Sequence, residues 1–186
     1  MSCSLRPVGR AHRARLEALV RDTGLFREAE VRTAVELLDE ALEGDEDYRF
    51  LGAFDGDELV GYACYGPTPD TAGTFDLYWI AVDRQRQGSG IGTQLVTAVE
   101  KTLSAIGGRL IVVETSSRAE YDPTRKFYEA RGYGRTATIP GYYAPGDDLV
   151  VYMKDLTRWT LAGRSCCARG ASPRSRRWRS GLGPST

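Results

Sequence analysis

One segment limits the possible folds more than any other, because it has the pattern of a strand, a glycine-rich turn and a helix in direct succession. Phe75–Val82 (FDLYWIAV) is rich in aromatic and β-branched residues, as buried strands are. Gln87–Gly92 then brings three glycines. After it, apolar residues recur every three or four positions, on one face of a helix: Leu95, Val99, Leu103 and Ile106. The segment therefore predicts a βα unit, which is a building block of α/β folds.

The patterns on either side extend this unit into one domain of about residues 1–156. Two amphipathic helices are predicted around Leu16–Val20 and over Glu28–Leu42, and a third runs from Pro123 to Gly132. Further strands are predicted at Ser4–Pro7, Tyr48–Phe54, Glu58–Gly66, Arg109–Glu114, Tyr133–Ile139 and Leu149–Asp155, with Pro140–Asp148 as a loop. This order predicts a single α/β domain with a mixed central sheet flanked by helices.

The charge of the chain is unevenly distributed. The totals of 25 basic and 25 acidic residues give a net charge of zero, but seven Arg and no acid follow Leu156. Residues 1–156 thus carry 18 basic and 25 acidic groups, a net charge of −7. Residues 157–186, rich in Arg, Ser and Gly, are predicted to be a disordered basic tail. The acidic domain disfavours nucleic acid as a partner, except through this tail.

Composition also bears on location and metal chemistry. No apolar run approaches the length of a membrane-spanning helix, and the Arg-containing N-terminal stretch has no apolar core of a secretory signal. The four cysteines show no ligand spacing, and His12 is the single histidine. We therefore expect a cytoplasmic protein without a metal site or a membrane partner. Histidine-centred catalysis has almost no residues to work with.

The glycine turn is a candidate anion-binding site. Glycines let backbone N–H groups approach a phosphate, and a following helix N-terminus adds unpaired donors and a favourable dipole. No Lys-Ser/Thr pair follows the glycines, so the turn is not a P-loop. Thr93 stands where the dinucleotide fingerprint needs its third glycine. The turn therefore favours a diphosphate ligand of another class.

Two motifs together resemble one known family. Gln87–Gly92 (Q-x-x-G-x-G) resembles the coenzyme A pyrophosphate loop of the GCN5-related N-acetyltransferase (GNAT) family, and Arg125–Tyr133 (RKFYEARGY) resembles that family's C-terminal FYExxGF element. The resemblance covers about residues 4–156. It implies a sheet whose two central parallel strands splay apart, with acetyl-CoA as co-substrate. It also implies transfer of an acetyl group to a primary amine of a small molecule or peptide, by a monomer or homodimer.

The resemblance assigns coenzyme A contacts to two segments. The end of the strand FDLYWIAV would border the pantetheine and acetyl group, and the glycine turn would hold the diphosphate. Many family members carry an asparagine where this chain has Tyr121, so Ser116, Ser117 or Asp122 would have to replace its contact with the pantetheine arm. The residues predicted to bind the cofactor are Ile80, Ala81, Val82, Gln87, Gly88, Ser89, Gly90, Gly92, Thr93 and Ser117.

The same resemblance suggests catalytic groups. Tyr128 falls where the family places a tyrosine beside the thioester sulfur, and a phenol can protonate a leaving thiolate. Asp76 is the first candidate for the base that deprotonates the amine, acting through water, and Glu114 is the second. Strand alternation predicts that Asp76 shares one face with three other residues, Tyr78, Ile80 and Val82.

The acceptor side is less defined by the sequence. Tyr78, Tyr142 and Tyr143 are predicted to bind the amine, and the negative charge of the domain favours a cationic one. A non-catalytic coenzyme A or acyl-CoA sensor remains the alternative, because the same loop would bind the cofactor without a placed base.

Overall fold

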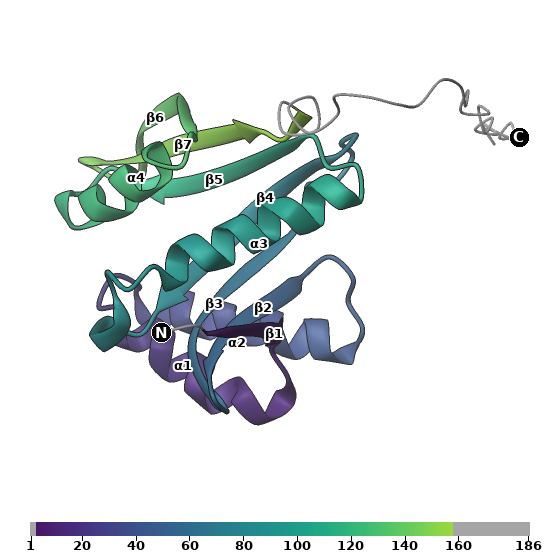
Figure 1. Ribbon diagram of the computed structural model, residues 1–186. Helices are drawn as coiled ribbons and strands as arrows, with labels where there is room; N and C mark the ends of the chain where they lie inside the picture. The colour runs from purple at the N-terminus through teal and green to yellow at the C-terminus, as the bar shows by residue number, and fades with distance from the viewer. Residues whose placement is uncertain (1–2, 158–186) are drawn as a thin grey trace, which may run out of the picture.

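The computed structural model describes residues 3–157, which form one seven-stranded sheet with helices on both faces (Figure 1). The strands are ordered β1-β2-β3-β4-β5-β7-β6, and all neighbours are antiparallel except β4 and β5. Their bounds are β1 Ser4–Pro7, β2 Arg49–Asp55, β3 Glu58–Pro67, β4 Thr74–Val82, β5 Leu110–Ser116, β6 Gly134–Ala144 and β7 Asp147–Asp155. The predicted α/β class with a mixed sheet is confirmed.

Each face of the sheet is covered by a different pair of helices. The helices are α1 Arg13–Asp22, α2 Glu28–Glu43, α3 Ile91–Ala105 and α4 Asp122–Glu129, with single turns of 3-10 helix at Arg10–His12, Arg84–Arg86 and Ala119–Tyr121. One buried cluster joins α3 and α4 to the sheet, and the other joins α1 and α2 to it. In the described residues, no helix has both the length and the apolar character that a membrane crossing requires.

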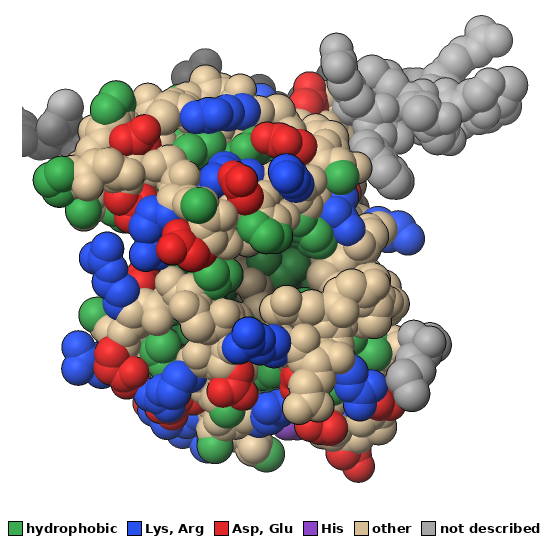
Figure 2. Space-filling model, turned by 90° about the vertical axis from the view of Figure 1, so that its left-hand side faces the viewer, with side chains coloured by type: hydrophobic (Ala, Val, Ile, Leu, Met, Phe, Trp, Pro, Cys, Tyr) green, Lys and Arg blue, Asp and Glu red, His purple; other side chains and the backbone are tan. Residues whose placement is uncertain are grey.

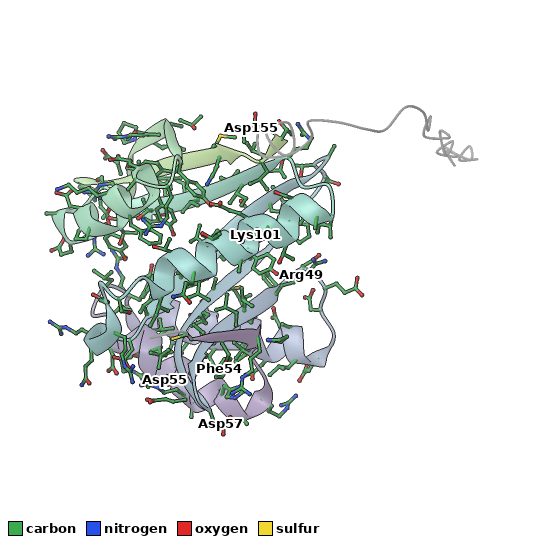
Figure 3. All side chains as sticks on the ribbon, in the orientation of Figure 1. Arg49, Phe54, Asp55, Asp57, Lys101 and Asp155 are labelled. Carbon is green, nitrogen blue, oxygen red and sulfur yellow. The ribbon has the colours of Figure 1, made fainter. Side chains whose placement is uncertain are left out.

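The parallel strands β4 and β5 pair along only part of their length. Their register runs from Thr74 opposite Leu110 to Asp76 opposite Val112, and no later pair forms between the described residues of the two strands. Figure 1 shows β4 and β5 diverging from there, which divides the molecule into a half with β5, β7, β6 and α4 and a half with β1–β4, α1 and α2. In Figure 3, Asp155 lies in the first half and Asp55 in the second.

A bulge in β4 overturns the predicted alternation of its side chains. Trp79 lies opposite Cys64 and Leu77 lies opposite Tyr65, so Tyr78 is an extra residue without a partner in β3. Ile80 and Val82 consequently pack against the α3 and α4 cluster, whereas Tyr78 packs against the α1 and α2 cluster. The prediction that Asp76, Tyr78, Ile80 and Val82 share one face is therefore wrong, because one inserted residue exchanges the two faces of a strand.

The segment Pro140–Asp148 is also not the predicted loop. β6 continues through it to Ala144, and β7 begins at Asp147, which leaves a tight turn at Pro145-Gly146. The register shifts between Ile139 and Ala144, so the residues between them form a bulge on the edge strand. Asp148 stabilises this bulge, because its carboxylate accepts a hydrogen bond of 2.8 Å from the Gly141 N–H.

A buried ion pair fixes α3 against the β5–β7 half. The Lys154 ammonium donates hydrogen bonds of 2.8 Å to both carboxylate oxygens of Glu100; the Glu100 side chain is buried, and that of Lys154 is 11% exposed. Removing one partner of such a pair is costly, because the other charge is left in the interior. The helix that follows the glycine turn is thereby held in place between the two halves.

The predicted basic tail lies almost entirely outside the described residues. Of 157–186, the structure includes Thr157 alone, so the predictions of disorder and of a nucleic-acid contact there stay predictions.

Candidate active site

The divergence of β4 and β5 opens a large cavity between the two halves. Its volume is about 1170 Å³, and it extends from the segment between α1 and α2, past β4 and β5, to the glycine turn and α4. Figure 2 faces the side toward which the strands diverge and shows a hollow between the halves with hydrophobic side chains at its base. The backbone of β4 beyond Asp76 borders this space without a partner strand on the β5 side.

The glycine turn forms one end of the cavity. Gly88 and Gly90 have φ angles of +78° and +87°, a left-handed conformation that favours glycine. Apart from their chain neighbours, no atom of the described residues lies within 4 Å of where a side chain would begin. Helix α3 begins at Ile91 without a side-chain cap, so its first N–H groups lack acceptors within the helix. A third glycine, Gly92, lets α3 approach α4, since an added Cβ would lie 3.1 Å from Phe127. This end can therefore accept an anion in contact with main-chain donors.

The predicted cofactor residues are divided by the fold. Those that line the cavity are Ile80, Ala81, Val82, Gln87, Gly88, Gly90, Gly92 and Thr93. Ser89 and Ser117 do not line it. The Ser89 hydroxyl donates to the Arg86 carbonyl, and the Ser117 hydroxyl accepts a 2.8 Å hydrogen bond from the Asp148 N–H. Ser89 therefore stabilises the turn before α3, and Ser117 links the end of β5 to the start of β7.

Arg131 lies at the glycine-turn end of the cavity, and the sequence patterns do not single it out. Its guanidinium lies 3.6 Å above the centre of the Phe127 ring and donates to the Phe127 carbonyl at 2.7 Å and to the Thr93 hydroxyl. A positive charge is thus placed beside the first turn of α3. The signal for it was present in RKFYEARGY, but the spacing alone does not bring α4 against the start of α3.

Tyr128 lines the middle of the cavity and is otherwise enclosed. The residue is 3% exposed, and its ring packs edge-on against Phe127 and Tyr133 at centroid distances of 5.3 and 5.4 Å. Its hydroxyl makes no hydrogen bond to any described residue. Burial raises the pKa of the Tyr128 phenol, so the group is protonated at neutral pH and available as a proton donor.

Two carboxylates face the cavity from the diverging strands. The Thr68 hydroxyl donates a hydrogen bond of 2.7 Å to Asp76, while Glu114 accepts no hydrogen bond from a described residue. Partial burial, and then the nearby charge of Asp76, raise the pKa of the Glu114 carboxyl above its ordinary value. A raised pKa makes the ionised Glu114 carboxylate a stronger base than an ordinary carboxylate.

The acceptor-side tyrosines lie in different surroundings. Tyr78 and Tyr143 line the cavity, and burial with neighbouring acidic charges raises the pKa of each to about 12. For Tyr143 these charges include Glu114, Asp147 and Glu30. Tyr142 does not line the cavity; it is 57% exposed, with its ring 5.0 Å from that of Tyr143. The tyrosine pair therefore presents one member to the cavity and one to solvent.

The comparisons with known proteins agree with this architecture. The chain matches the model of the acetyltransferase (GNAT) family over residues 15–133. A solved protein of the GNAT family from Desulfovibrio desulfuricans is 40% identical, with a TM-score of 0.79 over 83% of this chain and 99% of its own. The protein belongs to the GNAT acetyltransferase family, as its two motifs predicted, and this membership supports acetyltransferase activity in general.

More distant structures share the fold alone. An aminoglycoside 6′-N-acetyltransferase complexed with coenzyme A is 20% identical, with a TM-score of 0.67 over 82% of this chain and 97% of its own. The ribosomal-protein-S18-alanine N-acetyltransferase from Escherichia coli is 16% identical, with a TM-score of 0.68 over 83% of this chain and 94% of its own. A search of curated proteins finds no match to the chain.

Proposed function

We propose that this protein transfers an acetyl group from acetyl-CoA to a primary amine of a cationic small molecule or peptide. One observation carries the proposal: a single cavity has the glycine turn at one end and, where β4 and β5 diverge, both the enclosed Tyr128 phenol and the Glu114 carboxyl. Acetyl transfer needs a held cofactor, a proton acceptor for the amine and a proton donor for the thiolate. The cavity contains candidates for all three.

The cofactor end fits coenzyme A in shape and charge. The empty space beside Gly88 and Gly90 leaves room for a diphosphate against the backbone. Three arginines of this end, Arg84, Arg86 and Arg131, also border the cavity and suit an anionic ligand. The unpaired edge of β4, at Ile80–Val82, would bind the pantetheine and acetyl group through main-chain groups.

Acetyl-CoA, when bound, supplies an acetyl group activated as a thioester. Glu114 would accept a proton from the amine nitrogen as that nitrogen bonds to the acetyl carbon. Tyr128 would donate its proton to the sulfur as the carbon–sulfur bond breaks, and would regain one from solvent. We favour Glu114 over Asp76 as the base, because Asp76 already accepts the Thr68 hydrogen bond and raises the pKa of Glu114.

The acceptor end favours a positively charged substrate. The carboxylates of Glu30, Asp76 and Glu114 line this part of the cavity together with Tyr78 and Tyr143. Arg27 and Arg118 line it too, but Arg118 lies 3.4 Å from a further lining carboxylate, that of Asp147, so acidic groups outnumber basic ones here. Opposite charges at short range in a partly enclosed site attract an ammonium group. The net charge of −7 over residues 1–156 acts in the same direction.

A thiol-release assay tests the activity itself. The full chain is incubated with acetyl-CoA and a panel of polyamines, aminoglycosides, amino acids and peptides with free N-termini, and free coenzyme A is measured. Amine-dependent thiol release with an acetylated product is expected. Coenzyme A binding without thiol release across the panel would instead favour the acyl-CoA sensor.

Coenzyme A affinity should depend on the left-handed glycine at the start of α3. Gly90→Ala places a Cβ on a residue with φ of +87°, a conformation that costs an alanine about 1–2 kcal/mol. The free variant can relax away from this conformation, and binding must restore it. We expect the Kd for coenzyme A, measured by calorimetry, to weaken about tenfold.

Gly107→Ala is the matched control. Gly107 has φ of +85° just beyond the opposite end of α3, and it does not line the cavity. The strain of an alanine in this left-handed conformation should lower the stability of the folded protein and leave the Kd for coenzyme A unchanged. An equal loss of affinity in both variants would contradict a specific role for the turn at Gly90.

A further inference from the structure

Two hydrogen bonds join the halves of the molecule across the acceptor end of the cavity. The carbonyl of Leu25, between α1 and α2, accepts one of 3.1 Å from the Tyr121 hydroxyl and one of 3.5 Å from the Arg118 guanidinium. Tyr121 and Arg118 lie beyond β5, on the opposite side of the divergence of β4 and β5. All three residues line the cavity.

The Tyr121 and Arg118 side of this contact is firmly anchored. Tyr121 is 8% exposed, and the Arg118 guanidinium lies 5.2 Å from the centre of its ring. Arg118 also lies 3.4 Å from the carboxylate of Asp147, which is 5% exposed and accepts a hydrogen bond from Ser116. Burial raises the pKa of the Tyr121 phenol, so its hydroxyl keeps the proton that it donates.

The Leu25 side is a short connection that can respond to this contact. Segment 23–27 lies between α1 and α2 and lines the cavity. Within it, Gly24 has φ of +68°, and the Thr23 hydroxyl accepts from the Leu25 N–H at 3.2 Å. The ring of Phe26, which follows Leu25, has its centre 6.4 Å from the centre of the Trp79 ring in β4. Holding the Leu25 carbonyl therefore holds an apolar wall of the cavity.

We propose that Tyr121 and Arg118 are specificity-determining residues. Their two hydrogen bonds to the Leu25 carbonyl, called the clasp below, hold segment 23–27 over the acceptor end and so limit the size of the amine that can bind. The inference rests on the proposed function, because it assigns the amine to this end of the cavity. A loosened clasp would widen the acceptor pocket and leave the glycine turn, at the other end, unaffected.

The test is Tyr121→Phe, which removes the donor and keeps the ring. Hydrogen–deuterium exchange of the amides of 23–27 should become about fivefold faster, the effect expected from losing one hydrogen bond. Calorimetry with the coenzyme A complex should show that the affinity for a bulky amine, kanamycin, rises about five- to tenfold relative to that for a small one, 1,4-diaminobutane. The Kd for coenzyme A should stay within twofold of the wild-type value.

Tyr62→Phe is the control, because the Tyr62 hydroxyl is fully buried, has no hydrogen-bond partner within residues 3–157 and does not line the cavity. It should change neither exchange nor amine preference. Unchanged hydrogen–deuterium exchange of 23–27 in Tyr121→Phe would overturn the proposal. Faster exchange in which the affinities for both amines change equally would also overturn it, as would a failure of both amines to bind. If the amines bind with the expected preference but are not acetylated, the proposed function fails and the clasp stands.

Discussion

Tyr128→Phe should lower kcat about 100-fold and leave the Kd for coenzyme A within twofold of the wild-type value. The phenol is buried with a raised pKa, so it enters the reaction protonated and can give its proton to the departing thiolate. Phenylalanine fills the same space without that proton, and losing a general acid typically costs a factor of about 10² to 10⁴. Steady-state kinetics with an accepted amine, combined with calorimetry, separates the two quantities.

Tyr133→Phe is the matched control for this variant. Its ring packs edge-on against Tyr128 in the same aromatic cluster, but Tyr133 does not line the cavity. A similar loss of kcat in both variants would point to packing of the cluster. A loss below threefold in Tyr128→Phe would exclude Tyr128 as the acid.

Glu114→Gln should lower kcat/KM for the amine about 100-fold, because an amide cannot accept the proton. In the wild-type protein, kcat/KM should fall as the pH drops through the pKa of Glu114, since only the ionised carboxylate acts as a base. That pKa is raised by burial and by the charge of Asp76, so this fall should occur at higher pH than for an ordinary glutamate.

Asp76→Asn tests the role of Glu114 as the base through the direction in which the pH profile moves. Removing the negative charge of Asp76 lowers the pKa of Glu114, so the acidic fall of kcat/KM should move to lower pH while activity near neutrality is largely kept. A profile that does not move would contradict Glu114 as the group whose titration limits the rate. A greater loss in Asp76→Asn than in Glu114→Gln would instead assign the base to Asp76. A protein that acts only as a sensor would show no catalytic effect of either change.

The linear pattern predicted much of the cofactor end. The β4 strand, the glycine turn and the start of α3 are consecutive in the chain, so their spacing alone places three glycines before a helix N-terminus. FYEARGY added Tyr128, and both motifs together predicted the family. The sequence also predicted Asp76 and Glu114 as candidate bases. It could not show that Asp76 accepts a hydrogen bond from Thr68 while Glu114 accepts none from a described residue.

The acceptor end could not be predicted in the same way. Leu25 and Tyr121 are 96 positions apart, and no periodicity relates them. In the sequence, Tyr121 stands out only because it occupies the place of an expected asparagine. Its contact with Leu25 forms because the α1–α2 connection reaches the turn before α4 in the folded chain. The β4 bulge at Tyr78 could not be predicted for another reason. Most residues of this strand are apolar, so one extra residue in the pairing with β3 does not change the sequence pattern.

The sequence by itself determined the α/β class, the family and the glycine turn, because these depend on local periodicity and on motifs of neighbouring residues. The tertiary structure decided which face each β4 residue occupies, that Arg131 contacts Thr93, and that the Tyr121 hydroxyl donates a hydrogen bond to the Leu25 carbonyl across the opening. These features arise where β4 and β5 stop pairing, so that segments distant in the chain meet across the opening. Such contacts are fixed by how the two halves pack, which no single segment encodes.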